Sequence, residues 1–327
     1  MNALNSSLET LQARIVRKRN ETSDICSFEL HSMDGCALPV FEAGAHIDVH
    51  IPNGPVRQYS LCNPLSAGKH YEIAVLRDAQ SRGGSIGMHA LEEGQIIQIS
   101  APRNHFALAK HDARHHVLFA GGIGITPLWA MAQTLAQAGI SFELHYCTRT
   151  ENSTAFRERI RTSSFAERVF FYHDEDSNNR KLNVHEVLAA CSDPQTHLYV
   201  CGPSGFMDWI IDAGRQSGWS EERLHREYFS GAEVDTSEDG SFDVRIASTG
   251  AVLRIPADQP VSTVLLQNGI ALSTSCEQGV CGTCVVRVLE GVPEHRDMYL
   301  TDEEHARNDQ FTPCCSRAKS SCLVLDL

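Results

Sequence analysis

The chain has 327 residues and a formal net charge of -13, with 42% hydrophobic and 21% charged residues. At roughly 100–200 residues per domain, this length predicts two or three domains, and the composition is too apolar for a disordered chain. The negative charge disfavours binding to nucleic acid or to an anionic membrane. No secretory signal is recognisable, and the most apolar stretch, 117–132, is interrupted by three glycines and a proline. We therefore expect a cytoplasmic protein whose 12 cysteines stay reduced.

Residues 1–110 contain short segments in which apolar and polar side chains alternate. Strands are expected at 13–17, 25–30, 46–51, 57–61, 71–76 and 96–100. Because turns with glycine or proline separate them, the pattern predicts a small antiparallel β-barrel or sandwich.

The pattern changes in residues 111–231. A continuous apolar run at 116–120 is typical of a buried parallel strand. A glycine-rich turn and alternating segments follow it, at 127–138 (helix), 141–147 (strand), 154–162 (helix), 169–172, 184–190, 197–201 and 204–216 (helix). This alternation predicts an α/β doubly wound sheet.

The segment 232–241 is acidic and lacks core residues, so it is interpreted as a linker to a third domain at 242–327. That domain begins with a predicted hairpin, 242–247 and 251–255, and a helix at 261–268. A group of cysteines comes next.

Three cysteines follow the spacing C-x₄-C-x₂-C, and a fourth stands 29 intervening residues later: Cys276, Cys281, Cys284 and Cys314. This is the spacing of plant-type [2Fe–2S] ferredoxins, in which one loop wraps the cluster and a distant thiolate closes it. Gly279 and Gly282 suit a loop that passes close to sulfide and needs positive φ. Backbone N–H groups of such a loop can donate to the sulfurs.

Structural zinc is the competing interpretation, but zinc sites usually contain two short cysteine knuckles. Cys315, beside Cys314, is expected to be a buried neighbour of the cluster. The remaining cysteines without a partner pattern are expected to pack as small apolar side chains: Cys26, Cys36, Cys62, Cys147, Cys191 and Cys322.

The glycine-rich turn between strand and helix predicts a nucleotide site. Its candidate binding residues are Gly121, Gly122, Gly124, Thr126 and Pro127. Glycines permit close approach of a pyrophosphate, and the helix start supplies N–H donors. Tight turns of this kind also occur without a ligand, so the turn alone is weak evidence.

A second turn, Cys201-Gly202-Pro203, ends a later strand of the same sheet, and the two turns could converge on one nucleotide. For Cys201 a purely structural thiol is the alternative. Asp174, after the 169–172 strand, would repel a 2′-phosphate and so favours NADH. Arg149 keeps NADPH open, and Asp174 could equally belong to a solvated acidic loop.

In chain order the motifs RQYS (57–60), RGGS (82–85), GGIGITP, CGP and the cysteine spacing resemble the phthalate dioxygenase reductase family over about residues 10–327. The stretches 224–229, 276–284, 295–300 and 308–318 are most similar to its vanillate O-demethylase reductase subgroup. The resemblance implies a flavin barrel, a nucleotide domain and a C-terminal α+β ferredoxin domain of the β-grasp type.

The resemblance also implies FMN as the flavin. Arg57, Gln58, Tyr59 and Ser60 would then line the flavin, with Ser60 near N5. The terminal phosphate would be held by a second group: Arg82, Gly83, Gly84 and Ser85. Phe229 matches the aromatic residue that covers the other face of the flavin, and Glu227 matches a residue near the nicotinamide, which Cys201 would border.

The function implied is an NADH-dependent reductase that passes electrons through FMN and the [2Fe–2S] cluster to the Rieske centre of a separate aromatic oxygenase. The expected partner is an aromatic-acid dioxygenase or O-demethylase acting on vanillate- or phthalate-like compounds, and the family suggests a monomer. Two other functions remain open: a flavin or ferric reductase with an accessory cluster, and a non-catalytic redox sensor.

Overall fold

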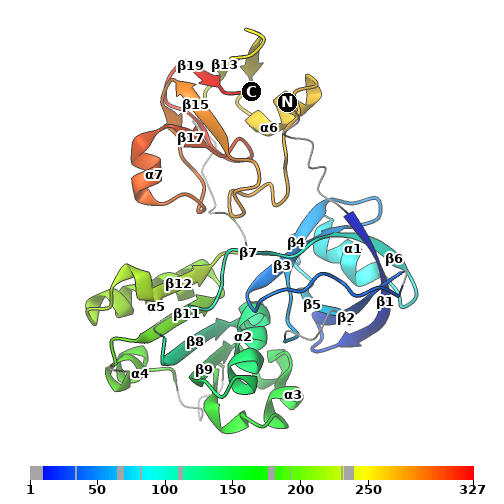
Figure 1. Cartoon of the computed structure of the whole chain (residues 1–327), viewed down its shortest axis with the longest axis vertical. Helices are drawn as coiled ribbons and strands as arrows, with labels where there is room; N and C mark the ends of the chain where they lie inside the picture. Colours follow the sequence, from blue (N-terminus) through cyan, green and yellow to red (C-terminus); the bar gives the residue numbers. More distant parts are fainter. Residues whose placement is uncertain are drawn as a thin grey trace. The chain divides into compact units, whose positions relative to one another are not determined.

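The computed structural model describes residues 10–33, 35–64, 70–81, 83–109, 113–175, 181–191, 193–229, 231 and 239–327. It divides into two compact units, Met1–Glu227 and Tyr228–Leu327. The first unit contains the predicted barrel and the predicted nucleotide domain, and the second contains the cysteine motif (Figure 1). The division falls after Glu227, whereas the sequence placed residues up to 231 with the nucleotide domain.

The barrel is a seven-stranded antiparallel sheet. Its strands are β1 (Thr10–Asn20), β2 (Ile25–Ser32), β3 (Ala45–His50), β4 (Val56–Ser60), β5 (Tyr71–Leu76), β6 (Ile96–Ser100) and β7 (Arg103–Asn104). The hydrogen-bonded order is β4-β3-β6-β1-β2-β5, with β7 beside β3. A bridge between Leu61 and Ile73 joins the two ends of this order and closes the sheet. Helix α1 (Gly84–Ala90) adds Met88 to the barrel core. The predicted antiparallel barrel is confirmed.

The second sheet is parallel throughout, as predicted. Its strands are β8 (His115–Gly121), β9 (Ser141–Thr148), β10 (Val169–His173), β11 (Thr196–Cys201) and β12 (Leu224–Glu227). Its helices are α2 (Ile125–Gln137), α3 (Arg157–Arg161), α4 (Val184–Ala190) and α5 (Ser204–Gln216), with 3₁₀ turns η1 (Gly122–Gly124), η2 (Glu151–Ser153), η3 (Ala166–Arg168) and η4 (Glu221–Arg223). Figure 1 shows α2 and α3 on one side of the sheet and α4 and α5 on the other.

In the strand order β10-β9-β8-β11-β12, the chain adds strands to one side of β8 first and then to its other side. Helices leave β8 and β11 toward opposite faces, which opens a crevice at the carboxyl ends of these strands. The helix expected at 154–162 is shorter in the structure, because Phe156 has φ 58° and the helix begins only at Arg157.

The two lobes of the first unit share a hydrophobic core. Cys62 and Phe106 of the barrel region belong to the same buried cluster as Trp129 of α2. A bidentate ion pair crosses the boundary, with Arg159 donating to both carboxylate oxygens of Glu72 at 2.6 and 2.9 Å. These contacts explain why two predicted domains form one compact unit.

The second unit is a mixed sheet with a helix packed on it. Its elements are β13 (Phe242–Ile246), β14 (Val252–Ile255), α6 (Val261–Gln267), β15 (Val286–Glu290), β16 (Pro293–Glu294), α7 (Asp302–Arg307), β17 (Gln310–Phe311), β18 (Arg317–Ala318) and β19 (Cys322–Leu325). The order is β14-β13-β19-β15-β17, with β13 parallel to β19, and β16 pairs with β18. Val261 and Leu265 of α6 enter the core. This arrangement is the predicted α+β domain.

The predicted linker 232–241 includes a residue that belongs to the second unit. The Asp239 side chain is only 6% exposed and receives hydrogen bonds from Arg296 at 2.9 and 2.5 Å. An acidic residue can thus be buried when a guanidinium pairs with it. Residues 232–238 lie outside the described residues. Among the described helices, none is long and apolar enough to cross a membrane.

Candidate functional site

Two glycine turns meet at the carboxyl ends of β8 and β11. A Cβ on Gly124 would lie 2.2 Å from the carbonyl oxygen of Cys201, and one on Gly202 would lie 2.9 Å from the Cα of Gly121. Both contacts are too close for any larger residue, so the turns touch through their backbones. The two turns that the sequence suggested could converge therefore lie together, at the place where open α/β sheets bind ligands.

The first of these turns has an open part and an enclosed part. Gly122 has φ +55°, and no atom lies within 4 Å of the place its Cβ would occupy. Thr126 and Pro127 are buried, and the Thr126 hydroxyl donates to the carbonyl of Ile123 at 3.1 Å. Protein encloses both side chains, which shape the turn, and their predicted contact with the nucleotide stays a prediction.

Phe206, in the first turn of α5, fills the space between the two turns. Its Cδ1 atom lies 3.0 Å from the Cβ positions of both Gly121 and Gly202. The neighbouring Trp209 is 43% exposed and lies 6.2 Å from the Phe206 ring, centroid to centroid. This aromatic pair was not predicted from the sequence, since an aromatic residue near the start of a helix usually packs in a hydrophobic core. The pair borders the crevice.

Ser60, Cys201 and Glu227 meet where β4, β11 and β12 end. The Ser60 hydroxyl donates to Oε2 of Glu227 at 3.4 Å, and Cys201 and Glu227 are register partners on adjacent strands. Burial raises the pKa of Glu227 to about 8, and the hydrogen bond from Ser60 only partly offsets it. Burial, followed by the charge of Glu227, raises the pKa of the Cys201 thiol well above its ordinary value. At neutral pH the Glu227 carboxyl is therefore protonated, and the Cys201 thiol is protonated and unreactive.

The predicted flavin motif and the predicted phosphate motif also lie together. A Cβ on Gly84, at the start of α1, would lie 2.9 Å from Cγ and 3.2 Å from Nε of Arg57 on β4. Gly83, just before the helix, has φ +92°. The Ser85 hydroxyl accepts a hydrogen bond from the backbone N–H of Asp78 at 3.0 Å. The start of α1 thus brings the Arg57 side chain next to the backbone of two glycines, and this combination is suited to binding a phosphate.

The other members of these motifs have different surroundings. The Gln58 amide donates to Asp48 at 3.3 Å, and burial raises the pKa of Tyr59, whose side chain packs on the barrel core. Arg82 lies outside the described residues.

The acidic and basic candidates for ribose recognition lie on neighbouring strands. Asp174 follows β10, and its N–H donates to the carbonyl of Thr148 at 3.0 Å. Arg149 follows β9, and its carbonyl accepts from Glu175 at 3.0 Å. Both side chains are exposed at the carboxyl edge of the sheet, so the choice between NADH and NADPH stays a prediction. Phe229 lies in the second unit and is 41% exposed, and its role over the flavin likewise stays a prediction.

The four predicted ligand cysteines are buried side by side in the second unit: Cys276, Cys281, Cys284 and Cys314. The neighbouring Cys281 and Cys314 thiols hold the pKa of Cys276 below its usual range. Cys284 also contacts Cys314. Sulfurs brought together without a disulfide can take up a metal cluster.

The backbone of this loop is shaped for the cluster. Gly279 and Gly282 have φ +74° and +68°, which confirms the expected positive values. The backbone N–H of Gln278 donates to Sγ of Cys276 at 3.4 Å, and the Thr283 hydroxyl lies 3.2 Å from Sγ of Cys281. Such bonds stabilise thiolates.

The spacing of the sulfurs argues against one zinc ion. Four thiolates around a single zinc would lie about 3.8 Å apart, given Zn–S bonds near 2.3 Å. In the described part of the chain, the groups of three or more ligand atoms that all lie within 4.8 Å of one another include none of these cysteines. Four sulfurs spread more widely than this fit a cluster of two irons better than a single zinc ion. Cys315 adjoins Cys314 and lies 3.3 Å from the Thr312 hydroxyl, but it is half-buried, whereas the sequence predicted a buried neighbour.

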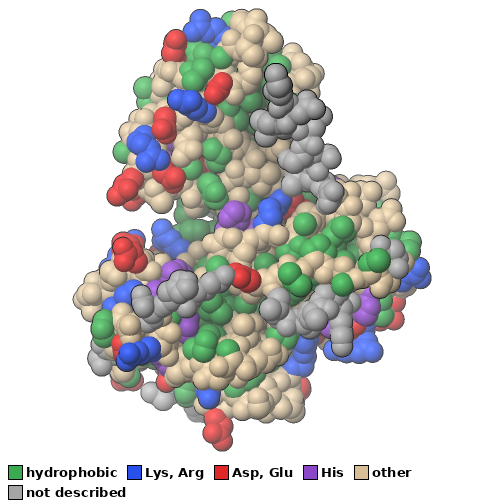
Figure 2. All heavy atoms as spheres, viewed as in Figure 1, with side chains coloured by type: hydrophobic (Ala, Val, Ile, Leu, Met, Phe, Trp, Pro, Cys, Tyr) green, Lys and Arg blue, Asp and Glu red, His purple; other side chains and the backbone are tan. Residues whose placement is uncertain are grey.

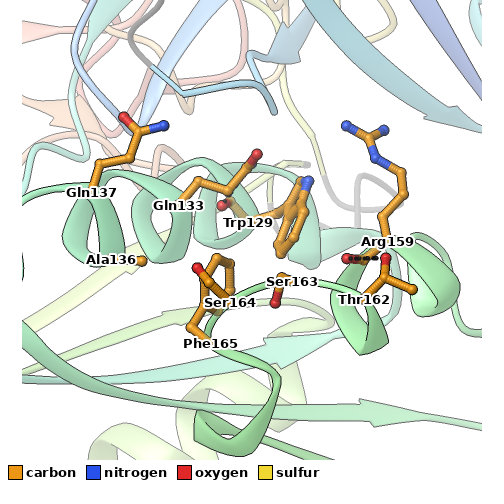
Figure 3. Close-up of a pocket in the computed structure, with 9 residues that line it drawn as sticks. All are labelled: Trp129, Gln133, Ala136, Gln137, Arg159, Thr162, Ser163, Ser164 and Phe165. Carbon is orange, nitrogen blue, oxygen red and sulfur yellow. Dashed lines mark hydrogen bonds between the residues drawn. The ribbon is translucent and has the colours of Figure 1, made fainter.

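A pocket of about 430 Å³ lies elsewhere in the first unit, between α2 and the segment 159–165 (Figure 3). Trp129 and Phe165 form its apolar side, and Gln133, Ser163 and Ser164 give it a polar rim. None of its lining residues belongs to the predicted cofactor site.

Comparisons with known proteins match two of the predicted domains. Residues 118–211 match the family model described as an oxidoreductase NAD-binding domain, and residues 244–319 match the 2Fe-2S iron-sulfur cluster binding domain. The chain is 53% identical to a vanillate O-demethylase oxidoreductase of Pseudomonas sp., over 97% of this chain and 100% of the relative. It is 39% identical to the phthalate dioxygenase reductase of Burkholderia cepacia, over 97% of each chain.

A solved structure is similar over the same extent. It is a phthalate dioxygenase reductase, described as a modular structure for electron transfer from pyridine nucleotides to [2Fe-2S], and it aligns with a TM-score of 0.78 over 97% of this chain and 98% of that one. The chain is therefore an oxidoreductase of the phthalate dioxygenase reductase family, with an NAD-binding domain and a [2Fe–2S] domain.

Proposed function

We propose that this protein is the reductase component of a two-component Rieske aromatic oxygenase system, which draws electrons from NADH and delivers them through FMN and the [2Fe–2S] cluster to the oxygenase. The observation that carries the proposal is the meeting of Ser60, Cys201 and Glu227 beside the two glycine turns. A pyridine nucleotide in this crevice would reach a flavin on β4. The relatives' names, which pair a reductase with a demethylase or a dioxygenase, support the same proposal.

The flavin proposed is FMN, held by β4 and the start of α1. Arg57, Gly83, Gly84 and Ser85 would bind its phosphate, and Tyr59 and Ser60 would line its ring. When bound, FMN supplies a centre that accepts a hydride and gives up electrons singly. The role of the chain is to orient the two rings and exclude water from them.

The nucleotide proposed is NADH. Gly122, Gly202 and Pro203 would border its pyrophosphate and nicotinamide, with Phe206 as an apolar wall. The protonated Glu227 carboxyl adds no charge beside the nicotinamide and can donate a hydrogen bond. Asp174 would accept a hydrogen bond from a free 2′-hydroxyl and repel a 2′-phosphate.

The partner proposed is an oxygenase for vanillate- or phthalate-like aromatic acids. Substrate choice would belong to that partner, because this chain only supplies electrons. Figure 2 shows acidic and basic side chains interspersed over the visible face of the second unit. Docking through a few specific contacts therefore fits this surface better than attraction by one broad acidic field.

The test is stopped-flow mixing of the flavin-loaded protein with NADH, for the wild type and for Cys281→Ser. We expect NADH to bleach the flavin in both proteins, and only the wild type to reduce cytochrome c or an added oxygenase. Absence of flavin bleaching in the wild type would contradict the reductase function and favour a redox sensor. Equal delivery by both proteins would favour a flavin or ferric reductase with an accessory cluster. If the flavin released from the protein by acid is FAD and not FMN, the choice of flavin is overturned.

A further inference from the structure

The Tyr299 ring lies on the cysteine loop. Gly282 and Thr283 lie between Cys281 and Cys284, and a Cβ on Gly282 would lie 2.1 Å from Cζ and 2.3 Å from Cε1 of Tyr299. The ring therefore occupies the space that a side chain at residue 282 would take. Tyr299 is 39% exposed, so the ring lies between the loop and solvent.

Asp297 holds the backbone that carries this ring. Its side chain is fully buried, and Oδ2 accepts hydrogen bonds from the backbone N–H of Tyr299 at 3.2 Å and of Leu300 at 2.8 Å. His305 on α7 approaches the same oxygen at 3.3 Å. A carboxylate with this many donors fixes a tight turn, because leaving any of the buried groups unpaired is costly.

A second tie joins the turn to the cysteine loop. The backbone N–H of Met298 donates to the carbonyl of Gly279 at 3.0 Å. Gly279 itself can hold no side chain, since its Cβ would lie 2.4 Å from Sγ of Cys315 and 3.0 Å from Cα of Asp297. The turn and the loop are thus fitted to each other at both of the loop's glycines.

We propose that Tyr299 is a positioning residue that shields the cluster-binding loop from water and thereby lowers the reduction potential of the cluster. This inference rests on the assignment of the [2Fe–2S] site. The potential of such clusters depends on hydrogen bonds to sulfur and on solvent exposure. Water admitted beside the loop stabilises the reduced state, which carries one more negative charge. The ring keeps that water away from the Cys281–Cys284 segment.

The experiment is an EPR-monitored redox titration of the full-length, flavin-loaded protein and four variants. Tyr299→Ala should shift the cluster potential to more positive values and speed the loss of its visible absorbance in an iron chelator. Tyr299→Phe should retain the wild-type potential, because shielding needs the ring and not the hydroxyl. Tyr299→Leu, which keeps apolar bulk, should give an intermediate shift. Val252→Ala, at a residue 59% exposed on β14, is the matched control and should change neither property.

Iron and sulfide assays separate the two ways in which the test can fail. A wild-type protein without iron and sulfide would refute the cluster and the proposed function together. A loaded Tyr299→Ala variant with an unchanged potential would refute the shielding role alone. If the alanine variant does not fold, an unchanged cluster potential in Tyr299→Leu would refute the shielding role instead. A shift of the potential in Tyr299→Phe as large as that in Tyr299→Leu would also refute it.

Discussion

Glu227 keeps a proton that most carboxyl groups lose well below neutral pH. Its pKa is about 8 in the folded protein, against an ordinary value of 4.5. Its contribution to stability is therefore fully present below about pH 4.5 and is lost as the pH rises toward 8, because the unfolded chain can ionise there and the folded protein cannot. The loss amounts to at most about 5 kcal/mol, from roughly 1.4 kcal/mol for each unit of pKa.

Glu227→Gln should remove this pH dependence, because the amide is neutral in both states. We expect the free energy of unfolding of the variant, relative to the wild type, to rise between pH 5 and pH 8. Urea unfolding of the flavin-loaded proteins, followed by tryptophan fluorescence, measures it. Glu167→Gln, at an exposed position, is the control and should give a constant difference. A constant difference for Glu227→Gln would show that the carboxyl is ionised at neutral pH.

At the scale of elements, the glycine turns are fitted to each other and not only to a ligand. Gly124→Ala would place Cβ 2.2 Å from Cys201 O and 2.6 Å from Gly202 N, both backbone atoms that cannot rotate away. We expect β8 and β11 to be pushed apart at their carboxyl ends, with a loss of about 1–3 kcal/mol in stability and weaker NADH binding.

Gly205→Ala is the matched control, since it lies in α5 with no atom within 4 Å of the new methyl. It should be neutral or stabilising by up to about 1 kcal/mol. Thermal unfolding and the KM for NADH measure both variants. Equal behaviour of the two would mean that the turns are not in contact in solution.

The elements also show how far the sequence could predict the molecule. Strand alternation, the glycine turns and the cysteine spacing are local patterns, so the three sheets and the positive φ values of Gly279 and Gly282 were predictable. Phe156 was not, because its left-handed backbone shortens a helix that the sequence pattern favours.

Contacts between distant segments could not be predicted, because no local pattern in the sequence records them. The burial of Asp239 depends on an arginine 57 positions away, and that of Thr126 on how α2 packs. Ser60 and Glu227 were linked only through family resemblance, because they lie 167 positions apart and no local pattern joins them.

At the scale of the whole molecule, each unit has its own buried core, so the two should unfold separately. Asp239→Asn removes the charge paired with Arg296, whose side chain is 9% exposed. We expect the transition of the second unit, followed by cluster absorbance, to fall, because Arg296 loses a buried carboxylate that accepts two of its hydrogen bonds and, among the described residues, keeps only Glu294 as an acidic partner. The transition of the first unit, followed by flavin fluorescence, should stay in place.

The control for this variant is Asp243→Asn, which breaks a pair in which both side chains are well exposed. Exposed pairs contribute about 0–1 kcal/mol, so neither transition should move. A fall of both transitions in Asp239→Asn would mean that the two units unfold as one.

The shared core of the first unit has a consequence for how this chain can be recombined. Ser60 comes from the barrel and Glu227 from the parallel sheet, and the ion pair between Glu72 and Arg159 fastens the two lobes together. A chimera that took its barrel from one reductase and its nucleotide lobe from another would mismatch these pairs and the core beneath them. Exchange of residues 239–327 would leave all of them intact. In engineered fusions, the barrel and the nucleotide lobe should therefore be exchanged together, as one piece.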